Sequence, residues 1–125
     1  LGIAGNSKNN SIAAGSGGDI LWGGSGSEAD TLVGGSGSDT FLYFYGNGND
    51  VFSNVSSYDT VWLDNVSLSQ ISSINTTSNS VTLGFQNGQQ IKVNGTGVSA
   101  KFHLAGNVDV KFNHNSGPLG GYWSL

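Results

Sequence analysis

The chain contains no cysteine and no methionine among its 125 residues, and its single proline is Pro118. Without cysteine, neither a disulfide bond nor a metal ion held by thiolates stabilises the fold. Charged residues make up only 10% of the sequence, so solubility has to come from Ser, Asn, Thr and Gly. The length fits one or two small domains.

Positive charge is also scarce. The chain has four basic residues, all of them lysines, and its formal net charge is −4. Because nucleic-acid-binding surfaces are rich in Lys and Arg, this composition excludes such a surface. No apolar run approaches the roughly 18 residues that indicate a membrane-spanning helix, so we expect no membrane span.

Glycine is abundant, with 21 residues, and much of it lies in a nonapeptide that recurs through the first half of the chain. The clearest copy is residues 34–42, GGSGSDTFL, and the pattern is G-G-x-G-x-D-x-U-x, in which U is a large apolar residue. Such a period is typical of a solenoid that binds calcium in its turns. The U positions fall 9 or 11 residues apart, at Ile3, Ile12, Leu21, Leu32, Phe41, Phe52 and Val61.

Each nonapeptide predicts one glycine-rich turn and one short strand. After the acid, as in residues 39–41, polar and apolar residues alternate, which indicates a strand with its U residue turned inward. Because one nonapeptide makes half of a flattened coil, turns on the same edge lie two repeats apart. We therefore expect two stacks: Asp19, Asp39 and Asp59 on one edge, and Asn10, Asp30 and Asp50 on the other.

The turns favour calcium as a ligand. Glycine permits φ > 0 and brings backbone carbonyl groups close together. Calcium takes about 6–8 oxygen ligands at ~2.3–2.6 Å, and a tight loop with one carboxylate supplies several of them. Solvated Gly-Ser-Asp turns are a common alternative, but phased copies favour the metal. A phosphate-binding loop is excluded, because no Gly-Lys-Ser/Thr motif with a following helix is present.

Residues 1–63 resemble the RTX family of secreted proteins, which are named for their glycine–aspartate nonapeptides. The resemblance implies an all-β fold, a right-handed parallel β-roll, with two to four calcium ions between stacked turns. In the family, position-six aspartates and backbone carbonyls of the glycine positions bind the ions. The matching residues here are Gly15, Gly17, Asp19, Gly24, Gly26, Asp30, Gly35, Gly37, Asp39, Gly46, Gly48, Asp50 and Asp59.

Three positions depart from the pattern. The first repeat carries Asn10 in place of the acid. Near the second edge, Glu28 takes the acid's place when counted forward, whereas Asp30 does when counted back from Leu32, and we favour Asp30. The last repeat keeps Asp59 but has no glycine, so we expect it to end the array.

The second half, residues 64–125, is predicted to be a β-sandwich-like cap with a C-terminal tail. Strands are predicted at Ser80–Phe85, Gln90–Asn94, Val98–Leu104 and Val108–Phe112. A three-residue loop with a left-handed Gly88 joins the first two strands and sets Leu83 against Ile91 and Val81 against Val93. Residues 67–75 are interpreted as a turn of helix or a loop. A cap is needed because an open coil end exposes unpaired strand edges.

No enzymatic site is predicted. His103 and His114 lie outside any nucleophile or metal-ligand motif, and no G-x-S-x-G motif is present. Ile3 already lies in the repeat phase and no signal-peptide pattern precedes it, so we expect the chain to be the C-terminal piece of a longer polypeptide. The resemblance implies one-step type I export and an extracellular or cell-surface location.

Three functions are compatible with the sequence. The favoured hypothesis is a calcium-dependent folding and secretion module, with residues 1–63 mostly disordered without calcium. The second is a structural subunit of a surface layer, adhesin or extracellular fibre, assembled by self-association of calcium-bound rolls. The third is a carbohydrate-binding module that uses Trp22, Tyr43, Tyr45 or Trp123. Residues 116–125 are compatible with an export signal, a docking tail or a disordered end.

Overall fold

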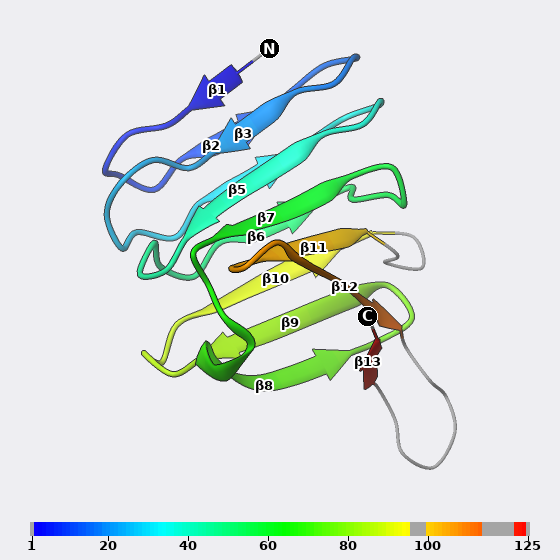
Figure 1. Cartoon of the computed structure of the whole chain (residues 1–125). Coiled ribbons are helices and arrows are strands. Elements are labelled where there is room, and N and C mark those ends of the chain that lie inside the picture. Colours follow the sequence, from blue (N-terminus) through cyan, green and yellow to red (C-terminus); the bar gives the residue numbers. More distant parts are fainter. Residues whose placement is uncertain (1, 96–99, 114–121, 125) are drawn as a thin grey trace.

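The computed structural model describes residues 2–95, 100–113 and 122–124. Within these ranges the chain forms two β-sheets and one short 3-10 helix (Figure 1). One sheet has the strand order β1-β3-β5-β7-β11-β12-β13, and the other has the order β2-β4-β6-β10-β9-β8. The all-β prediction is therefore confirmed. No helix in the described part of the chain has the length and apolar character needed to cross a membrane.

The nonapeptides form a solenoid of parallel coils, and Figure 1 shows β1, β3, β5 and β7 stacked in order. Each coil contributes one strand to each sheet. The strands pair parallel in a register of 20 residues, so that Leu21 lies beside Phe41 and Phe41 beside Val61. The bounds are β1 (Gly2–Ala4), β2 (Ser11–Ala13), β3 (Ile20–Trp22), β4 (Thr31–Val33), β5 (Thr40–Phe44), β6 (Val51–Ser53) and β7 (Thr60–Asp64).

The U residues form the interior of the solenoid, as their period predicts. Five of them are fully buried, and the remaining two, Ile3 and Ile12 in the first coil, are half-buried. Phe41 and Phe52 stack across the two sheets with ring centroids 5.3 Å apart. Each buried large side chain contributes about 1.5–3 kcal/mol to folding. The fully buried U residues are Leu21, Leu32, Phe41, Phe52 and Val61.

The second half extends both sheets. Strand β10 pairs parallel with β6, and β11 pairs parallel with β7, so the last strands of the solenoid are covered. One hydrophobic cluster runs through both halves. The division at residue 63 stays a prediction. The bounds are η1 (Leu68–Gln70), β8 (Ile71–Thr76), β9 (Ser80–Phe85), β10 (Gln90–Asn94), β11 (Lys101–Leu104), β12 (Val108–Asn113) and β13 (Tyr122–Ser124).

The β9–β10 hairpin agrees with the prediction. Leu83 pairs with Ile91, Val81 pairs with Val93, and Gly88 has a φ of 85°. By contrast, the interpretation of residues 67–75 as a turn of helix or a loop is wrong beyond η1, because Ile71–Thr76 forms strand β8. A bulge between Ile71 and Ser73 lets two isoleucines three residues apart both pack against the core, which imitates helical spacing.

Two predicted segments lie partly outside the described residues. The predicted strand at residues 98–104 is observed from Lys101 onwards, since residues 96–99 are not described. Of the predicted tail, residues 122–124 form β13, which pairs antiparallel with β12. The alternatives for residues 116–121 and 125 therefore stay predictions.

Candidate metal centre

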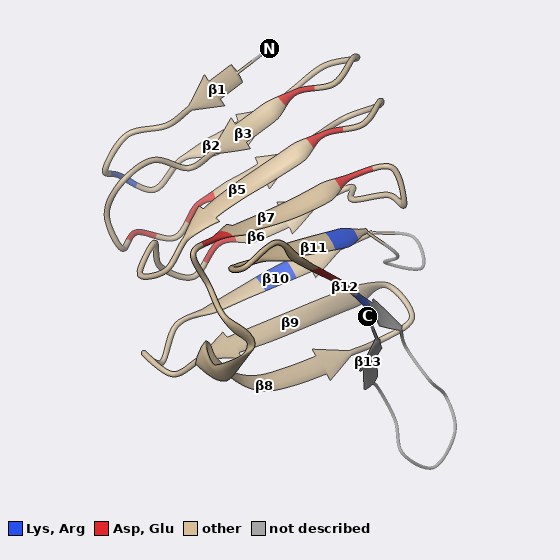
Figure 2. Cartoon of the chain, viewed as in Figure 1, with Lys and Arg blue, Asp and Glu red and all other residues tan. Residues whose placement is uncertain are grey.

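Three aspartates stack along one edge of the solenoid. Asp19, Asp39 and Asp59 each immediately precede a strand of the larger sheet, and all three are at least 96% buried. The Asp19 N–H donates to Asp39 Oδ1 at 2.9 Å, and the Asp39 N–H donates to Asp59 Oδ1 at 2.8 Å. Figure 2 shows acidic residues along the edges of the solenoid, where loops join strands. The predicted stack is therefore present.

The opposite edge carries the second predicted stack. The Asn10 N–H donates to Asp30 Oδ1 at 2.7 Å, and the Asp30 N–H donates to Asp50 Oδ1 at 3.0 Å. Asp30 and Asp50 are buried, whereas Glu28 is exposed, so Asp30 occupies the stacked position. Asn10 accepts a hydrogen bond from the Asn6 N–H at 2.7 Å, which closes the first turn without an acid.

Each ladder uses only one oxygen of a carboxylate. Asp39 Oδ2 is buried, lies against Gly34, and has no hydrogen-bond partner within the described ranges. Asp59 differs, because its Oδ2 accepts from the Ser56 N–H at 2.8 Å and from Ser56 Oγ at 3.3 Å. The glycine-free final turn therefore satisfies its own acid with protein donors, whereas the Asp39 turn leaves an oxygen available for a cation.

Backbone carbonyls supply the other oxygens of these turns. A Cβ atom built on Gly35 would collide with the Gly15 carbonyl oxygen, and one on Gly37 would collide with that of Gly17. Gly17 and Gly37 have φ of 99° and 95°, which glycine adopts without strain. Stacked turns thus approach with carbonyl oxygens facing the next turn. Carboxylate and carbonyl oxygens are the hard donors that calcium prefers.

The second edge is built less regularly. A Cβ on Gly24 would meet the Asn6 carbonyl oxygen at 2.6 Å, and one on Gly48 would collide with the Ser27 carbonyl oxygen. The Asn47 amide donates to the Gly26 carbonyl oxygen at 3.3 Å, so one candidate ligand already has a partner. The two-residue insertions shift this register, so Gly48 does not face Gly26 as the sequence match expects.

Burial and mutual repulsion raise the pKa of acids in both stacks. Burial is the largest cause of the raised pKa of Asp39, and the nearby carboxylates of Asp59 and Asp19 add to it. Burial, with a contribution from Asp30, raises the pKa of Asp50 to about 7. In the part of the chain that the structure describes, no ion pair joins these acids to a lysine. Buried charge without a counter-ion is costly, and a bound cation would remove that cost.

The donor set limits what kind of ion fits. No cluster of three or more His, Cys, Asp or Glu side chains that could bind a metal occurs in residues 2–95, 100–113 or 122–124. Carbonyl oxygens therefore have to provide much of the coordination, which suits calcium and disfavours metals that prefer imidazole or thiolate. Sequence reasoning missed the roles of Asn47 and Ser56, although each stands where other turns carry glycine.

Comparison with protein families supports this interpretation of the repeats. Residues 3–27 and 26–42 match a family described as "RTX calcium-binding nonapeptide repeat (4 copies)". The matched segments contain Asp19, Asp30 and Asp39, and end before Asp50 and Asp59. No curated protein matches the chain in sequence.

Proposed function

Because residues 3–42 place the chain in the family of RTX calcium-binding nonapeptide repeats, we propose that it is a calcium-dependent folding and export module of a secreted or cell-surface protein. The repeats bind calcium, and the proposal concerns where the ions lie and what binding achieves. One observation carries it: Asp39 is 1% exposed, with one oxygen unsatisfied by the described residues and no lysine beside it.

On the edge of Asp19, Asp39 and Asp59, one ion lies between the turn of residues 15–19 and the turn of residues 35–39. Its ligands are the carboxylates of Asp19 and Asp39 and carbonyls of glycine positions that face each other. On the other edge, ions lie between turns at residues 24–30 and 46–50. The proposed ligands are Gly15, Gly17, Asp19, Gly35, Gly37 and Asp39 on the first edge, and Gly24, Gly26, Asp30, Gly46, Gly48 and Asp50 on the second.

Binding would couple calcium to folding. The ions bind only the stacked coils, so calcium stabilises the folded state by mass action. Calcium is scarce in the cytosol and plentiful outside the cell. The chain would therefore stay unfolded for export and fold outside, with residues 1–63 mostly disordered until calcium is present. The binding chemistry belongs to the repeats, and no catalytic step is assigned to them.

Calorimetric titration with calcium tests the proposed ligands. We expect Asp39→Asn to weaken calcium binding by about tenfold or more, because an amide has no charge to offset that of the ion. Asp109→Asn is the matched control, since Asp109 lies on β12 outside the repeats, and it should bind calcium as the unmodified chain does. Equal affinity of all three proteins would overturn the assigned ligands. A circular dichroism spectrum unchanged by calcium would overturn the folding role.

A structural role in an assembly is the second candidate. Strands β1 and β2 form the ends of the two sheets as described, and each pairs on one side only. Such edges can pair with another coil. Light scattering with and without calcium distinguishes the two functions, because a monomer at all calcium concentrations contradicts assembly.

A further inference from the structure

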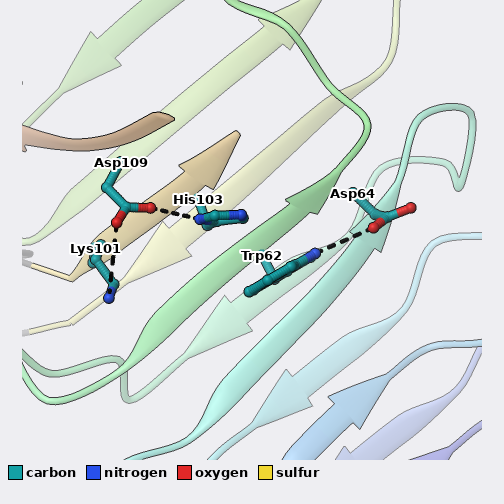
Figure 3. Close-up of polar contacts among 5 residues, drawn as sticks. All are labelled: Trp62, Asp64, Lys101, His103 and Asp109. Atoms are coloured by element: carbon teal, nitrogen blue, oxygen red, sulfur yellow. Dashed lines mark hydrogen bonds and ion pairs between the residues drawn. The ribbon is translucent and has the colours of Figure 1, made fainter. Parts of the chain in front are cut away.

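A pocket outside the repeats lies at the junction of the solenoid and the cap. It has a volume of about 360 Å³ and lies between the end of β7 and the β11–β12 turn. Pockets of this size are large enough for a small ligand. Its lining includes Trp62, Asp64, Asn65, His103 and Asn107 (Figure 3 shows three of them).

Two stacked rings form one wall of the pocket. Trp62 on β7 and His103 on β11 are register neighbours, and their ring centroids are 3.9 Å apart with an interplanar angle of 28°. Asp109 fixes the imidazole through a 2.6 Å contact between its Oδ1 and His103 Nδ1. Figure 3 shows the other ring nitrogen turned away from Asp109, toward the side where Trp62 points at Asp64. The wall is therefore positioned before any ligand arrives.

The remaining polar groups come from the ends of the strands. Asp64 Oδ1 accepts from Trp62 Nε1 at 3.2 Å, and its Oδ2 receives no hydrogen bond from the described residues. Asn65 and Asn107 lie in the two turns that border the pocket, and both have a φ of 58°. Asparagine tolerates this left-handed conformation, so the turns present carboxamides on the lining.

The lining selects among ligand classes. Asp64 gives the pocket a negative group and no lysine or arginine lines it, which disfavours anions. A single carboxylate is poor for a divalent cation, and the abundance of polar groups disfavours an apolar ligand. Carboxylate, carboxamide and imidazole groups beside an indole match a neutral molecule with many hydroxyl groups and one apolar C–H face. We propose that this pocket binds a neutral pyranose sugar.

The pocket differs from the aromatic sites that the sequence suggested for a carbohydrate. Tyr43 is fully buried and its hydroxyl donates to the Gly48 carbonyl oxygen at 2.8 Å, so its prediction as a sugar platform is wrong. Tyr45 packs edge-on against Phe85, and Trp22 packs edge-on against Phe44. The side chain of Trp123 lies outside the described residues. Trp62, at 37% exposure, escaped notice because its pairing with His103 spans 41 residues.

A glycan array tests the proposal with the full, calcium-loaded chain. We expect binding to neutral glycans and none to sulfated or sialylated ones. Binding confined to acidic glycans, or no binding by a protein whose circular dichroism shows the calcium-induced fold, would overturn the proposal. Because calcium titration is measured separately, failure here leaves the calcium-dependent folding role intact.

Point variants then test the location, using calorimetric titration with the best neutral glycan from the array. Asn107→Gly keeps the left-handed turn but removes the carboxamide, and it should weaken binding about fivefold to tenfold. Asn54→Gly is the matched control, because Asn54 also has a φ of 58° but lies outside the pocket, and it should bind normally. Trp62→Ala should abolish detectable binding. Unchanged affinity in both Asn107→Gly and Trp62→Ala would overturn this site.

Discussion

Asp39 and Asp50 show how a single buried side chain links the fold to its solution conditions. In the folded chain both have a raised pKa, mainly because burial penalises the charged form. Each accepts a backbone hydrogen bond from the coil before it, and this bond fixes the carboxylate at the turn. Without calcium, protonation is the remaining way to neutralise such a group.

The pH dependence of the metal-free chain follows from these shifts. An acid whose pKa is higher in the folded state binds more protons there than in the unfolded chain, so low pH favours folding. For Asp50 this advantage is fully present below about pH 3.8 and is lost as the pH rises through about 7. We therefore expect metal-free protein to show more β-structure at pH 5 than at pH 8 by circular dichroism.

Calcium should reverse this dependence, because protons then compete with the ion for the same carboxylates. The affinity for calcium should fall as the pH drops from 8 to 5, and calorimetric titration at several pH values measures it. A metal-free chain that is less ordered at pH 5 than at pH 8 would contradict the buried, unpaired state of these acids.

Gly35 and Gly46 form a matched pair that separates backbone strain from contact between turns. Both have positive φ, 80° and 96°. A Cβ at Gly46 would enter open space, whereas one at Gly35 would collide with the Gly15 carbonyl oxygen. Gly46→Ala should therefore cost only the left-handed strain, about 1–2 kcal/mol of unfolding free energy.

Gly35→Ala should destabilise the chain more and should also weaken calcium binding, because it pushes two stacked turns apart. Thermal unfolding in calcium and calorimetric titration measure the two effects. If both variants lose the same stability and the same calcium affinity, the close approach of the turns does not matter for the site.

At the scale of the strands, periodic patterns predicted more than local composition did. Leu83, Ile91, Val81 and Val93 alternate along two segments, so the register of the β9–β10 hairpin follows from burying one face. Strand β8 was missed because its bulge breaks the alternation of Ile71 and Ile74. The stacked acids were predictable from the repeat period alone, whereas the Trp62–His103 wall depends on a parallel pairing between distant segments.

Strand β8 provides a test of the cap as an element. Ile74 is half-buried and packs against the core, whereas Asn75 is exposed. We expect Ile74→Ala to lower the unfolding free energy by about 1–2 kcal/mol, toward the low end for a buried isoleucine, without changing calcium affinity. Asn75→Ala is the control and should unfold as the unmodified chain does in a denaturant titration. Equal stability of the two variants would show that β8 contributes little packing.

At the scale of the molecule, the solenoid and the cap share one interior. Strands β10 and β11 complete the hydrogen bonds of β6 and β7, and the core cluster includes residues from both halves. The solenoid offers roughly one large apolar side chain per nonapeptide, which is little to offset the entropy of ordering nine residues. The cap therefore contributes both edge protection and burial that the repeats lack.

A chain truncated to residues 1–63 should fail to fold as a monomer even in calcium. It would expose the edges of β6 and β7 together with the side chains of Phe52, Val61 and Leu63, which are fully buried in the whole molecule. Circular dichroism and light scattering in millimolar calcium should show a disordered or aggregated chain. A monomeric, β-rich fragment would contradict this dependence on the cap.

The direction of the side-chain ladders gives assembly of the solenoid a polarity. The carboxylate of Asp59 accepts from the Asp39 N–H, and that of Asp39 accepts from the Asp19 N–H, so each coil anchors the amide of its N-terminal neighbour. A coil can dock only onto a template that already presents its acid. The cap supplies that template, and ordering should spread from it toward the N-terminus, one coil at a time.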